Sequence, residues 1–279
     1  MSGFSPSWLD LREGADHRAR DKELLARLAH YFDGWNSVSI CDLGTGTGSN
    51  LRATAPYLCQ WQQWTLVDHD PELLAAAHSE IADWASAPHA TAPNFEITKF
   101  GRTIAVSLKT ADLAHDPAPW DTPPDLVTAA ALFDLVSAEW IERFAKAVAE
   151  EKAVFYTALT HSKPAVWRPP HSADGAVTAA FEHHFGRDKG FGLSSGSHAS
   201  QLLADAFSAA GYEVLRRDSS WRLGEEDRRL IAELAGGYAK AVSETGLVPP
   251  EQVSAWLAAR MNSGTCIVGH EDLLAFPPR

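Results

Sequence analysis

The stretch Cys41-Asp42-Leu43-Gly44-Thr45-Gly46-Thr47-Gly48 decides the fold that we expect for this chain of 279 residues. It closes a short run with β-branched residues, Ser37 to Leu43, which predicts a buried strand, and Ser49 to Tyr57 behind it predicts a helix. A glycine-rich turn between a strand and a helix brings the backbone close to a ligand and points the N-terminus of the helix at it. The stretch therefore predicts a binding loop for a nucleotide-type cofactor.

Two familiar glycine-rich loops do not match this one. The dinucleotide fingerprint G-x-G-x-x-G/A requires Gly or Ala where this chain has Ser49, and a phosphate-binding P-loop requires G-K-[ST], which is missing. The carboxylate of Asp42 is favourable beside a cationic aminoacyl and sulfonium group, whereas it repels a pyrophosphate. The alternative is an Asp that caps the next helix or orders the turn.

Strands and helices alternate through the first half of the chain. Further strands are expected at Trp64 to Asp68, Asp125 to Ala130 and Ala153 to Leu159, and helices at Glu72 to Trp84 after Pro71 and at Ala138 to Glu151. Asn94 to Phe100 and Thr103 to Thr110 predict a hairpin whose second arm enters the main sheet. This alternation predicts a parallel sheet with helices on both faces.

The remaining segments complete the predicted organisation as one domain over 1–279. Further elements are helices at Asp16 to Phe32 and Ser200 to Ala210, strands at Tyr212 to Trp221 and Thr265 to Phe276, and two helices between Glu225 and Met261 separated at Pro249-Pro250. His161 to Ser197 lacks a regular pattern and is longer than an ordinary loop, so we interpret it as a substrate-side lid. The expected parts are an N-terminal helical segment (1–36), a cofactor-binding core (37–160), the lid (161–197) and the C-terminal half of the sheet (198–279) with a helical insertion (225–261).

Two more carboxylates follow predicted strands. Asp68 ends the second strand, where it can accept hydrogen bonds from both ribose hydroxyls, unless it is only a surface or N-cap carboxylate ahead of Pro71. Asp112 follows the third sheet strand and can accept a hydrogen bond from an adenine amino group, with Leu113 packing on the ring. With Asp42, these acids form an ordered set at three predicted strand ends.

With these motifs, the segment from Ser37 to Leu159 resembles a class I S-adenosylmethionine-dependent methyltransferase. The resemblance implies an α/β fold with a Rossmann-like, doubly wound, mostly parallel seven-stranded sheet and helices on both faces, to which this chain adds the inserted lid and extra C-terminal helices. It also implies S-adenosylmethionine as cofactor and S-adenosylhomocysteine as product. The cofactor-binding residues that it implies are Asp42, Gly44, Thr45, Gly46, Gly48, Asp68, His69, Asp112, Leu113, Ala129 and Ala130.

Two further features concern the N-terminal segment and the residues after the fourth predicted strand. The N-terminal segment can fold over the cofactor and pair its carboxylate with Arg12, Arg18 or Arg20, because arginine suits bidentate carboxylate recognition; the alternative is a solvated helix face with surface charge pairs. Phe133 and Asp134 stand where many small-molecule enzymes of the family have a pair of polar or His residues. An Asn-Pro-Pro-Tyr-like motif is also missing there, which disfavours an enzyme that methylates amino groups of nucleobases or glutamine.

The candidate catalytic residues are His161, which follows the fifth strand, and His183. A neutral histidine with a pKa of about 6.5 can deprotonate a hydroxyl or an amine; the alternative for each is a packed or exposed histidine without chemistry. The irregular spacing of His171, His183, His184 and Asp188 disfavours a metal site, so no metal is expected. Aromatic residues in and near the lid either line the substrate-binding site or only pack within the lid. They are Trp167, Phe181, Phe185, Phe191 and Trp221.

Composition narrows the class of substrate. A formal net charge of −12 and the lack of any Lys or Arg run disfavour nucleic acid, so a small-molecule substrate is expected. Three widely spaced cysteines argue against a disulfide framework and indicate a reducing, cytoplasmic location. The sequence lacks a stretch of about 18 apolar residues, so no membrane partner is expected. The oligomeric state is left open.

The sequence therefore predicts an S-adenosylmethionine-dependent methyltransferase that acts on oxygen, nitrogen or carbon of a small molecule. An NAD-type oxidoreductase is the first alternative, which Ser49 and Asp42 weaken. The second is a non-catalytic module that binds S-adenosylmethionine, since a fold by itself does not establish turnover.

Overall fold

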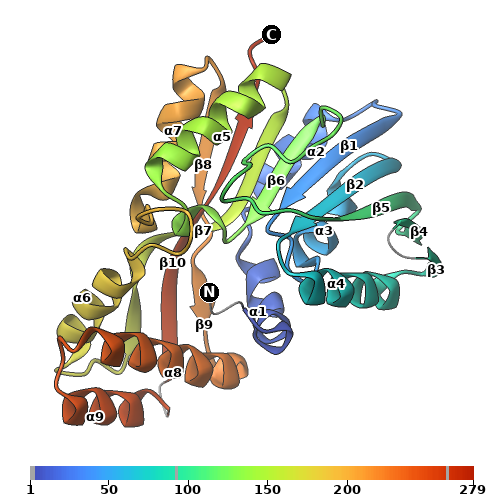
Figure 1. Ribbon diagram of the computed structural model, residues 1–279. Coiled ribbons are helices and arrows are strands. Elements are labelled where there is room, and N and C mark those ends of the chain that lie inside the picture. The colour runs from blue at the N-terminus through green and yellow to red at the C-terminus, as the bar shows by residue number, and fades with distance from the viewer. Residues whose placement is uncertain (1–3, 92–93, 262–263) are drawn as a thin grey trace.

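The computed structural model describes residues 4–91, 94–261 and 264–279, and its central feature is one twisted sheet (Figure 1). The strands, in spatial order, are β3 (Ala87–Thr91), β4 (Asn94–Lys99), β5 (Arg102–Thr110), β2 (Trp61–Asp68), β1 (Ser37–Leu43), β6 (Leu126–Ala130), β7 (Val154–Arg168), β10 (Thr265–Phe276) and β8 (Glu213–Asp218). The strands β5, β2, β1, β6 and β7 are parallel, and β10 and β8 are antiparallel to their neighbours. The mostly parallel sheet with all seven expected strands is thus confirmed.

Three further strands enlarge the described sheet to ten. The hairpin expected around Gly101 is present, and its first arm, β4, continues the sheet to β3 in antiparallel fashion. The expected sixth strand, Tyr212 to Trp221, is divided: β8 ends at Asp218, and β9 (Trp221–Leu223) pairs with the first part of β10.

Helices cover both faces of the sheet, as predicted. They are α1 (Pro6–Ala19), α2 (Lys22–Tyr31), α3 (Ser49–Thr54), α4 (Pro71–Trp84), α5 (Ala138–Glu151), α6 (Asp174–Phe185), α7 (Ala199–Ala209), α8 (Arg228–Thr245) and α9 (Pro250–Arg260). Short 3₁₀ turns lie at η1 (Ala55–Tyr57), η2 (Phe133–Leu135), η3 (Gly196–His198) and η4 (Glu225–Asp227). None of the described helices is long and apolar enough to cross a membrane.

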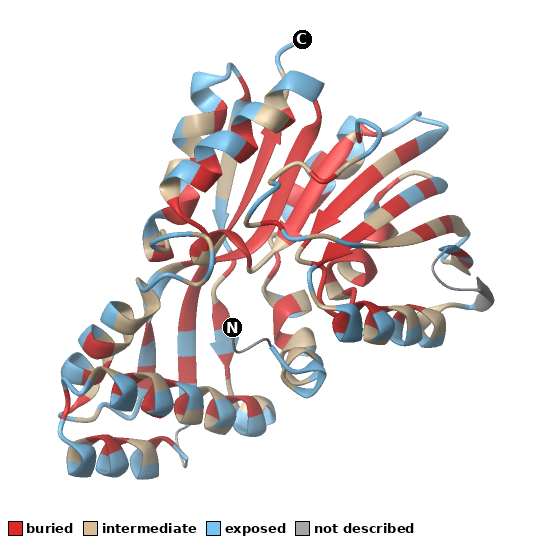
Figure 2. Cartoon of the chain, in the orientation of Figure 1, coloured by how far each residue is buried: buried red, intermediate tan, exposed pale blue. Residues whose placement is uncertain are grey.

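Alternation along β1 explains why the sheet has a hydrophobic core on each face. Val38 and Ile40 join the cluster that α2, α3 and α4 cover, whereas Cys41 and Leu43 join the cluster that α5 and α7 cover. A strand that is buried on both faces needs apolar side chains at nearly every position. Figure 2 shows the central strands as almost continuously buried.

The expected single N-terminal helix over Asp16 to Phe32 is wrong, because the helix is interrupted at Arg20 and Asp21. Arg20 has an extended ψ of 139°, and Asp21 caps α2 by accepting the N–H of Leu24 at 2.8 Å. The N–H of Asp21 donates to the buried Oδ2 of Asp272 at 2.9 Å. A good N-cap residue with a tertiary partner for its own N–H therefore starts a new helix. The first helix also begins earlier than expected, at Pro6 after its cap Ser5.

The segment 161–197 was expected to be irregular, and this is also wrong. β7 continues to Arg168 because β10 pairs with it antiparallel along this length, and α6 follows. We call the second half of β7 (161–168), β9, the first half of β10 (265–270), α6, α8 and α9 the C-terminal lobe. The two helices expected between Glu225 and Met261 are α8 and α9 of this lobe.

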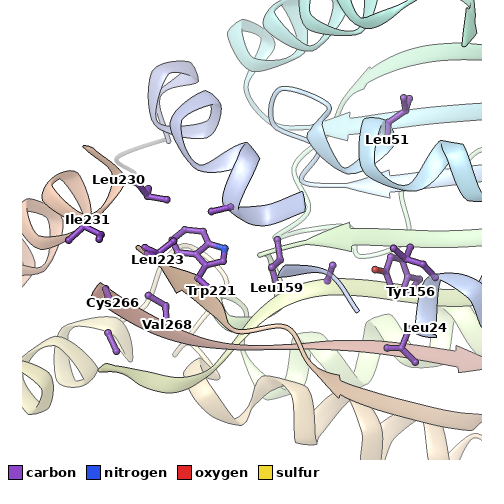
Figure 3. Close-up of a cluster of buried hydrophobic side chains, with 14 of the residues drawn as sticks. Leu24, Leu51, Tyr156, Leu159, Trp221, Leu223, Leu230, Ile231, Cys266 and Val268 are labelled. Carbon is purple, nitrogen blue, oxygen red and sulfur yellow. The ribbon is translucent and has the colours of Figure 1, made fainter. Parts of the chain in front are cut away.

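The C-terminal lobe shares one hydrophobic cluster with the face of the sheet that α2 covers. In Figure 3, Leu159 and Trp221 lie between side chains of the sheet, such as Tyr156, and side chains of the lobe, such as Leu223. The lobe is therefore continuous with the sheet through β7 and β10, and its core is not separate.

Candidate functional site

The glycine-rich loop lies between β1 and α3, at the carboxyl edge of the parallel sheet. Gly44, Gly46 and Gly48 have φ angles of +61°, +55° and +77°, a region that residues with a Cβ rarely adopt. A Cβ on Gly48 would also lie 2.8 Å from Cδ1 of Ile81 in α4. Glycine is therefore required both for the turn and for its close approach to α4.

Asp42 is fully buried beneath this loop. Its Oδ2 accepts a hydrogen bond from the Thr45 hydroxyl at 2.6 Å, and its Oδ1 accepts one from the Asn50 amide at 2.6 Å. Burial raises the pKa of Asp42 to about 6, although these two hydrogen bonds oppose the shift. The contacts correspond to the role of ordering the turn, and a contact with the cofactor stays a prediction.

Asp68 holds the loop from the end of β2. Its Oδ2 accepts the N–H of Gly46 at 2.9 Å, and its Oδ1 accepts the N–H of Asp70 at 3.1 Å. The ring of His69 lies 3.2 Å from the same Oδ1. A carboxylate has about four acceptor positions, so Oδ2 keeps one for a ribose hydroxyl, while Oδ1 is contacted by both Asp70 and His69.

The other predicted cofactor residues lie along the same edge. Asp112 follows β5, its side chain is 58% exposed, and it accepts the N–H of Ala114 at 2.9 Å. This backbone hydrogen bond and the neighbouring His115 lower the pKa of Asp112. Leu113 is buried, and Ala129 pairs with Leu43 across β6 and β1, with Ala130 next along β6. Asp112 therefore presents an ionised carboxylate to solvent where the adenine is expected.

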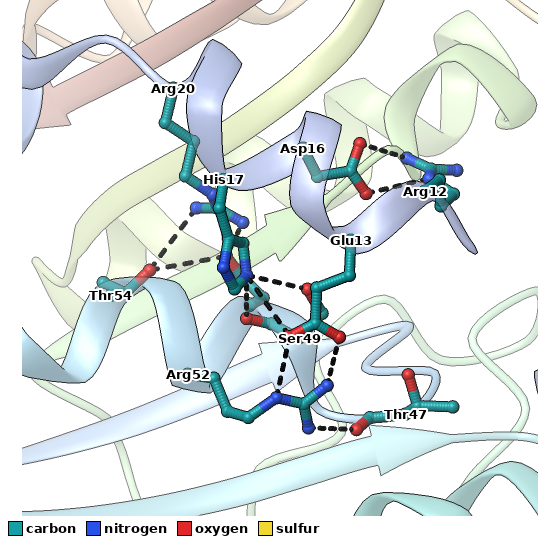
Figure 4. Close-up of polar contacts among 10 residues, drawn as sticks. Arg12, Glu13, Asp16, His17, Arg20, Thr47, Ser49, Arg52 and Thr54 are labelled. Carbon is teal, nitrogen blue, oxygen red and sulfur yellow. Dashed lines mark hydrogen bonds and ion pairs between the residues drawn. The ribbon is translucent and has the colours of Figure 1, made fainter. Parts of the chain in front are cut away.

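Helix α1 lies against the glycine-rich loop (Figure 4). A Cβ on Gly46 would meet Cδ1 of Leu9 at 3.0 Å. Glu13 forms an ion pair with Arg52, which also donates to the carbonyl of Thr47 at 2.8 Å. His17 Nε2 lies 3.0 Å from the Ser49 hydroxyl. The N-terminal segment therefore covers the loop and is fixed to α3.

The three N-terminal arginines already have partners within the chain. Arg12 makes a bidentate contact with Asp16, and Arg20 donates to Asn50 at 2.8 Å. Arg18 pairs with Asp227 at 2.5 Å. We correct the expectation for Arg18, because this ion pair ties α1 to the turn before α8 and does not direct Arg18 to the loop.

A second group of polar side chains, three of them buried and one partly exposed, lies at the same edge of the sheet, and we call it the His161 cluster. It consists of Asp134 in η2, His161 in β7, Glu182 in α6 and His270 in β10. His161 and His270 are cross-strand partners with ring centroids 6.2 Å apart, and His161 Nε2 lies 3.5 Å from Glu182 Oε1. β6 and β7 are the next strands after β1, so the cluster adjoins the loop.

The burial of this cluster changes its protonation. Burial raises the pKa of Asp134, although the nearby His161 opposes the shift. Burial and the charge of Arg12 lower the pKa of His270 well below its ordinary value. At neutral pH His270 is therefore a neutral imidazole.

Two left-handed residues shape the strand ends that carry the cluster. Ala131, after β6, has φ of 52°, and Leu159, in β7, has φ of 60°. The N–H of Leu159 donates to the buried carboxylate of Asp272 at 2.9 Å, and the N–H of Ala131 donates to the carbonyl of Ala158 at 2.9 Å. Strained backbone of this kind is typical of functional sites, where the surrounding structure enforces it.

Of the two candidate catalytic histidines, only His161 joins the cluster. His183 is exposed on α6, and His184 pairs with Glu244 at 2.9 Å on the surface of the lobe. Within the described residues, no group of three or more His, Cys, Asp or Glu side chains is placed to hold a metal. Phe185 and Trp221 reach the cluster, with ring centroids 5.3 Å from His161 and 5.1 Å from His270, respectively.

Sequence reasoning did not assign Asp134 or His270 to the site, whereas Glu182 was among the candidates in 161–197. Asp134 was visible only as a departure from the family pattern, and His270 interrupts an otherwise apolar strand. An ionisable residue within a buried strand is the signal that would have identified His270.

The strand order and the loop define a fold, which is that of Rossmann-like, class I S-adenosylmethionine-dependent methyltransferases. A putative methyltransferase from Bacillus halodurans is similar at a TM-score of 0.51 and 14% identity, over 91% of this chain and 99% of that one. The cyclopropane synthase MmaA2 from Mycobacterium tuberculosis is similar at a TM-score of 0.52 and 10% identity, over 98% and 94%. No protein-family model and no curated protein matches the sequence.

Proposed function

We propose that this chain is an S-adenosylmethionine-dependent methyltransferase that acts on a small molecule, with His161 as the general base. The observation that carries this proposal is that the glycine-rich loop and the His161 cluster lie along the same edge of one sheet: the loop follows β1, Asp134 follows the adjacent β6, and His161 lies on β7, the strand after β6. A cofactor loop and an acceptor site must adjoin for a methyl group to pass between them.

The residues of the loop suit S-adenosylmethionine. Asp42 and Asp68 are buried carboxyl groups at the ends of β1 and β2, and the buried Asp134 lies in η2 after β6, where its Oδ1 has no hydrogen-bond partner in the described part of the chain. Negative charge of this kind favours a sulfonium and an aminoacyl cation over a pyrophosphate. Asp68 would hold the ribose and Asp112 the adenine amino group.

When bound, S-adenosylmethionine supplies an electrophilic methyl group. The chain contributes position, exclusion of water and proton transfer. α1 closes the loop from one side, and α6 closes the cluster through Glu182 and Phe185. His161 Nε2 has no hydrogen-bond partner among the described residues and lies 3.5 Å from Glu182 Oε1, so we propose this nitrogen as the one that accepts a proton from an acceptor molecule.

The binding part of the proposal is tested by calorimetry with S-adenosylhomocysteine and with NAD. We expect the wild type to bind the first and not the second, and Gly46→Arg to abolish binding because a side chain there collides with Leu9 and fills the loop. Gly101→Arg is the matched control, since Gly101 also has a positive φ of +72° but lies on the β4–β5 turn. Binding of NAD alone would show that the chain is an oxidoreductase and not a methyltransferase.

The catalytic part is tested with a radioactive methyl donor and fractions of a cell extract. We expect label in the fraction of small metabolites, and not in the protein or RNA fractions. His161→Gln should lower the rate by about 10²–10⁴-fold while it leaves the affinity for S-adenosylhomocysteine unchanged. Cofactor binding without label in any fraction would instead support a non-catalytic module.

A further inference from the structure

The His161 cluster contains buried polar atoms that its own side chains do not satisfy. The buried polar atoms without a hydrogen-bond partner in the described part of the chain include Asp134 Oδ1, His161 Nε2, Glu182 Oε1 and His270 Nδ1. Asp134 is 7% exposed, His161 6% and His270 7%. Buried polar atoms in folded proteins almost always have partners, so these atoms indicate a ligand that would supply them.

The charge of the cluster indicates what that ligand must carry. Asp134 and Glu182 are carboxyl groups, and the nearest guanidinium, that of Arg12, is held by both oxygens of Asp16 and lies over the ring of Trp221 at 5.3 Å. The imidazole of His270 is neutral because burial and Arg12 lower its pKa. Asp134 is buried, Glu182 is partly buried, and Arg12 is already paired with Asp16, so the two carboxyl groups favour a positively charged ligand.

Hydrogen-bond geometry distinguishes an amine from an alcohol at this site. An ammonium group has three donors and no acceptor, whereas a hydroxyl group has one donor. The unpartnered atoms come from three directions, namely η2, the β7–β10 pair and α6, so a donor with three N–H bonds can serve more of them. The aromatic rings of Phe185 and Trp221 beside the histidines are compatible with a cation as well.

We propose that the methyl acceptor of this site is an aliphatic amine, bound as its ammonium ion by Asp134 and Glu182 and deprotonated by His161. This inference rests on the proposed function. The ammonium group gives one proton to Nε2 of His161, and the nitrogen lone pair then forms the new bond to the methyl carbon. The carbon–sulfur bond breaks and its electron pair stays on sulfur, which becomes the neutral thioether. His161 afterwards releases its proton to water.

The test is calorimetry on the full chain saturated with S-adenosylhomocysteine, using amine and alcohol pairs with the same carbon skeleton. The probes are hexylamine with hexanol and 2-phenylethylamine with 2-phenylethanol. We expect at least one amine to bind about tenfold or more tightly than its alcohol, as hydrogen bonds to charged groups imply. The preference should disappear in Asp134→Asn and decrease in Glu182→Gln.

Glu244→Gln is the matched control, because Glu244 is a half-exposed carboxylate that pairs with His184 outside the cluster. It should leave the amine preference unchanged. Glu182→Gln also serves if Asp134→Asn does not fold, since the Glu182 side chain is 30% exposed and tolerates substitution better. The expected kinetic counterpart is a larger KM for the amine in Glu182→Gln at an unchanged affinity for S-adenosylhomocysteine.

The two proposals fail in different ways. If S-adenosylhomocysteine binds and no amine binds more tightly than its alcohol, the amine inference is overturned while the proposed function stands. The same holds if the preference persists in Asp134→Asn and Glu182→Gln. If S-adenosylhomocysteine does not bind, the proposed function fails and the inference fails with it.

Discussion

Two features require glycine at position 48, namely its left-handed backbone and its close approach to Ile81, and their effects on stability can be measured separately. We expect Gly48→Ala to lower the free energy of unfolding by about 3 kcal/mol, from the left-handed conformation and from overlap with Ile81. Gly101→Ala should cost only about 1 kcal/mol, because Gly101 has a φ of +72° but no described atom within 4 Å of an added Cβ. Urea denaturation of both variants gives the comparison, and equal losses would contradict the role of Ile81.

Asp42 predicts a pH dependence of stability with a definite sign. Its pKa is raised from 3.8 to about 6 in the folded chain, so the protonated carboxyl stabilises the fold. That contribution is complete below the unfolded pKa and is lost as the pH rises through the folded pKa. Relative to Asp42→Asn, the wild type should therefore lose about 2 kcal/mol of unfolding free energy between about pH 4 and about pH 7. Urea titrations at several pH values measure this difference, and parallel curves would contradict it.

The cofactor loop could be predicted from the sequence because its residues are close along the chain. Gly44, Gly46 and Gly48 need no distant partner to be recognised, and the acids at the ends of β2 and β5 follow local strand patterns. The His161 cluster could be predicted only in part. Asp134 and His270 meet His161 through the order of β6, β7 and β10, and that order is a property of the folded sheet.

Among the secondary structure elements, the second half of β7 is a strand where the sequence predicted an irregular segment. His161-Ser-Lys-Pro-Ala-Val-Trp-Arg168 contains a proline and four polar or charged residues, so its alternation is weak, although Ala165 and Trp167 are buried and Val166 between them is exposed. Pairing with β10, which lies far along the chain, supplies the missing hydrogen bonds. Tertiary pairing therefore overrides a weak local preference here.

Helix α1 depends on one buried ion pair for its position on α3. In Glu13→Gln, the Arg52 side chain, which is 5% exposed, keeps its charge without a carboxylate partner. We expect a loss of about 2 kcal/mol in unfolding free energy and about tenfold weaker binding of S-adenosylhomocysteine, because Arg52 also holds the carbonyl of Thr47.

Glu225→Gln is the control for this ion pair. Glu225 pairs with Arg228, but both side chains are largely exposed, so the change should stay within about 0.5 kcal/mol. Denaturation and calorimetry on both variants make the comparison. If Glu13→Gln changes the unfolding free energy and the binding affinity as little as Glu225→Gln does, then the ion pair with Arg52 does not determine the position of α1.

For the molecule as a whole, the shared hydrophobic cluster predicts that sheet and lobe unfold together. Val242→Ala, a change at a buried position of α8, should lower the midpoint of a single thermal transition by about 5 °C. Circular dichroism and tryptophan fluorescence should report the same midpoint. Two transitions, of which only one shifts, would show that the lobe is an independent unit.

The bond between the N–H of Leu159 and the carboxylate of Asp272 marks the rung at which β7 and β10 leave the sheet for the C-terminal lobe. Both strands continue past this point, although their register is irregular between Glu271 and Leu273, so the C-terminal lobe is joined to the sheet through two strands and not through a single loop. A chimera that takes its acceptor specificity from another protein must replace both strands at matched register. The point where Leu159 contacts Asp272 is therefore where a chimera should join a different C-terminal lobe to this sheet.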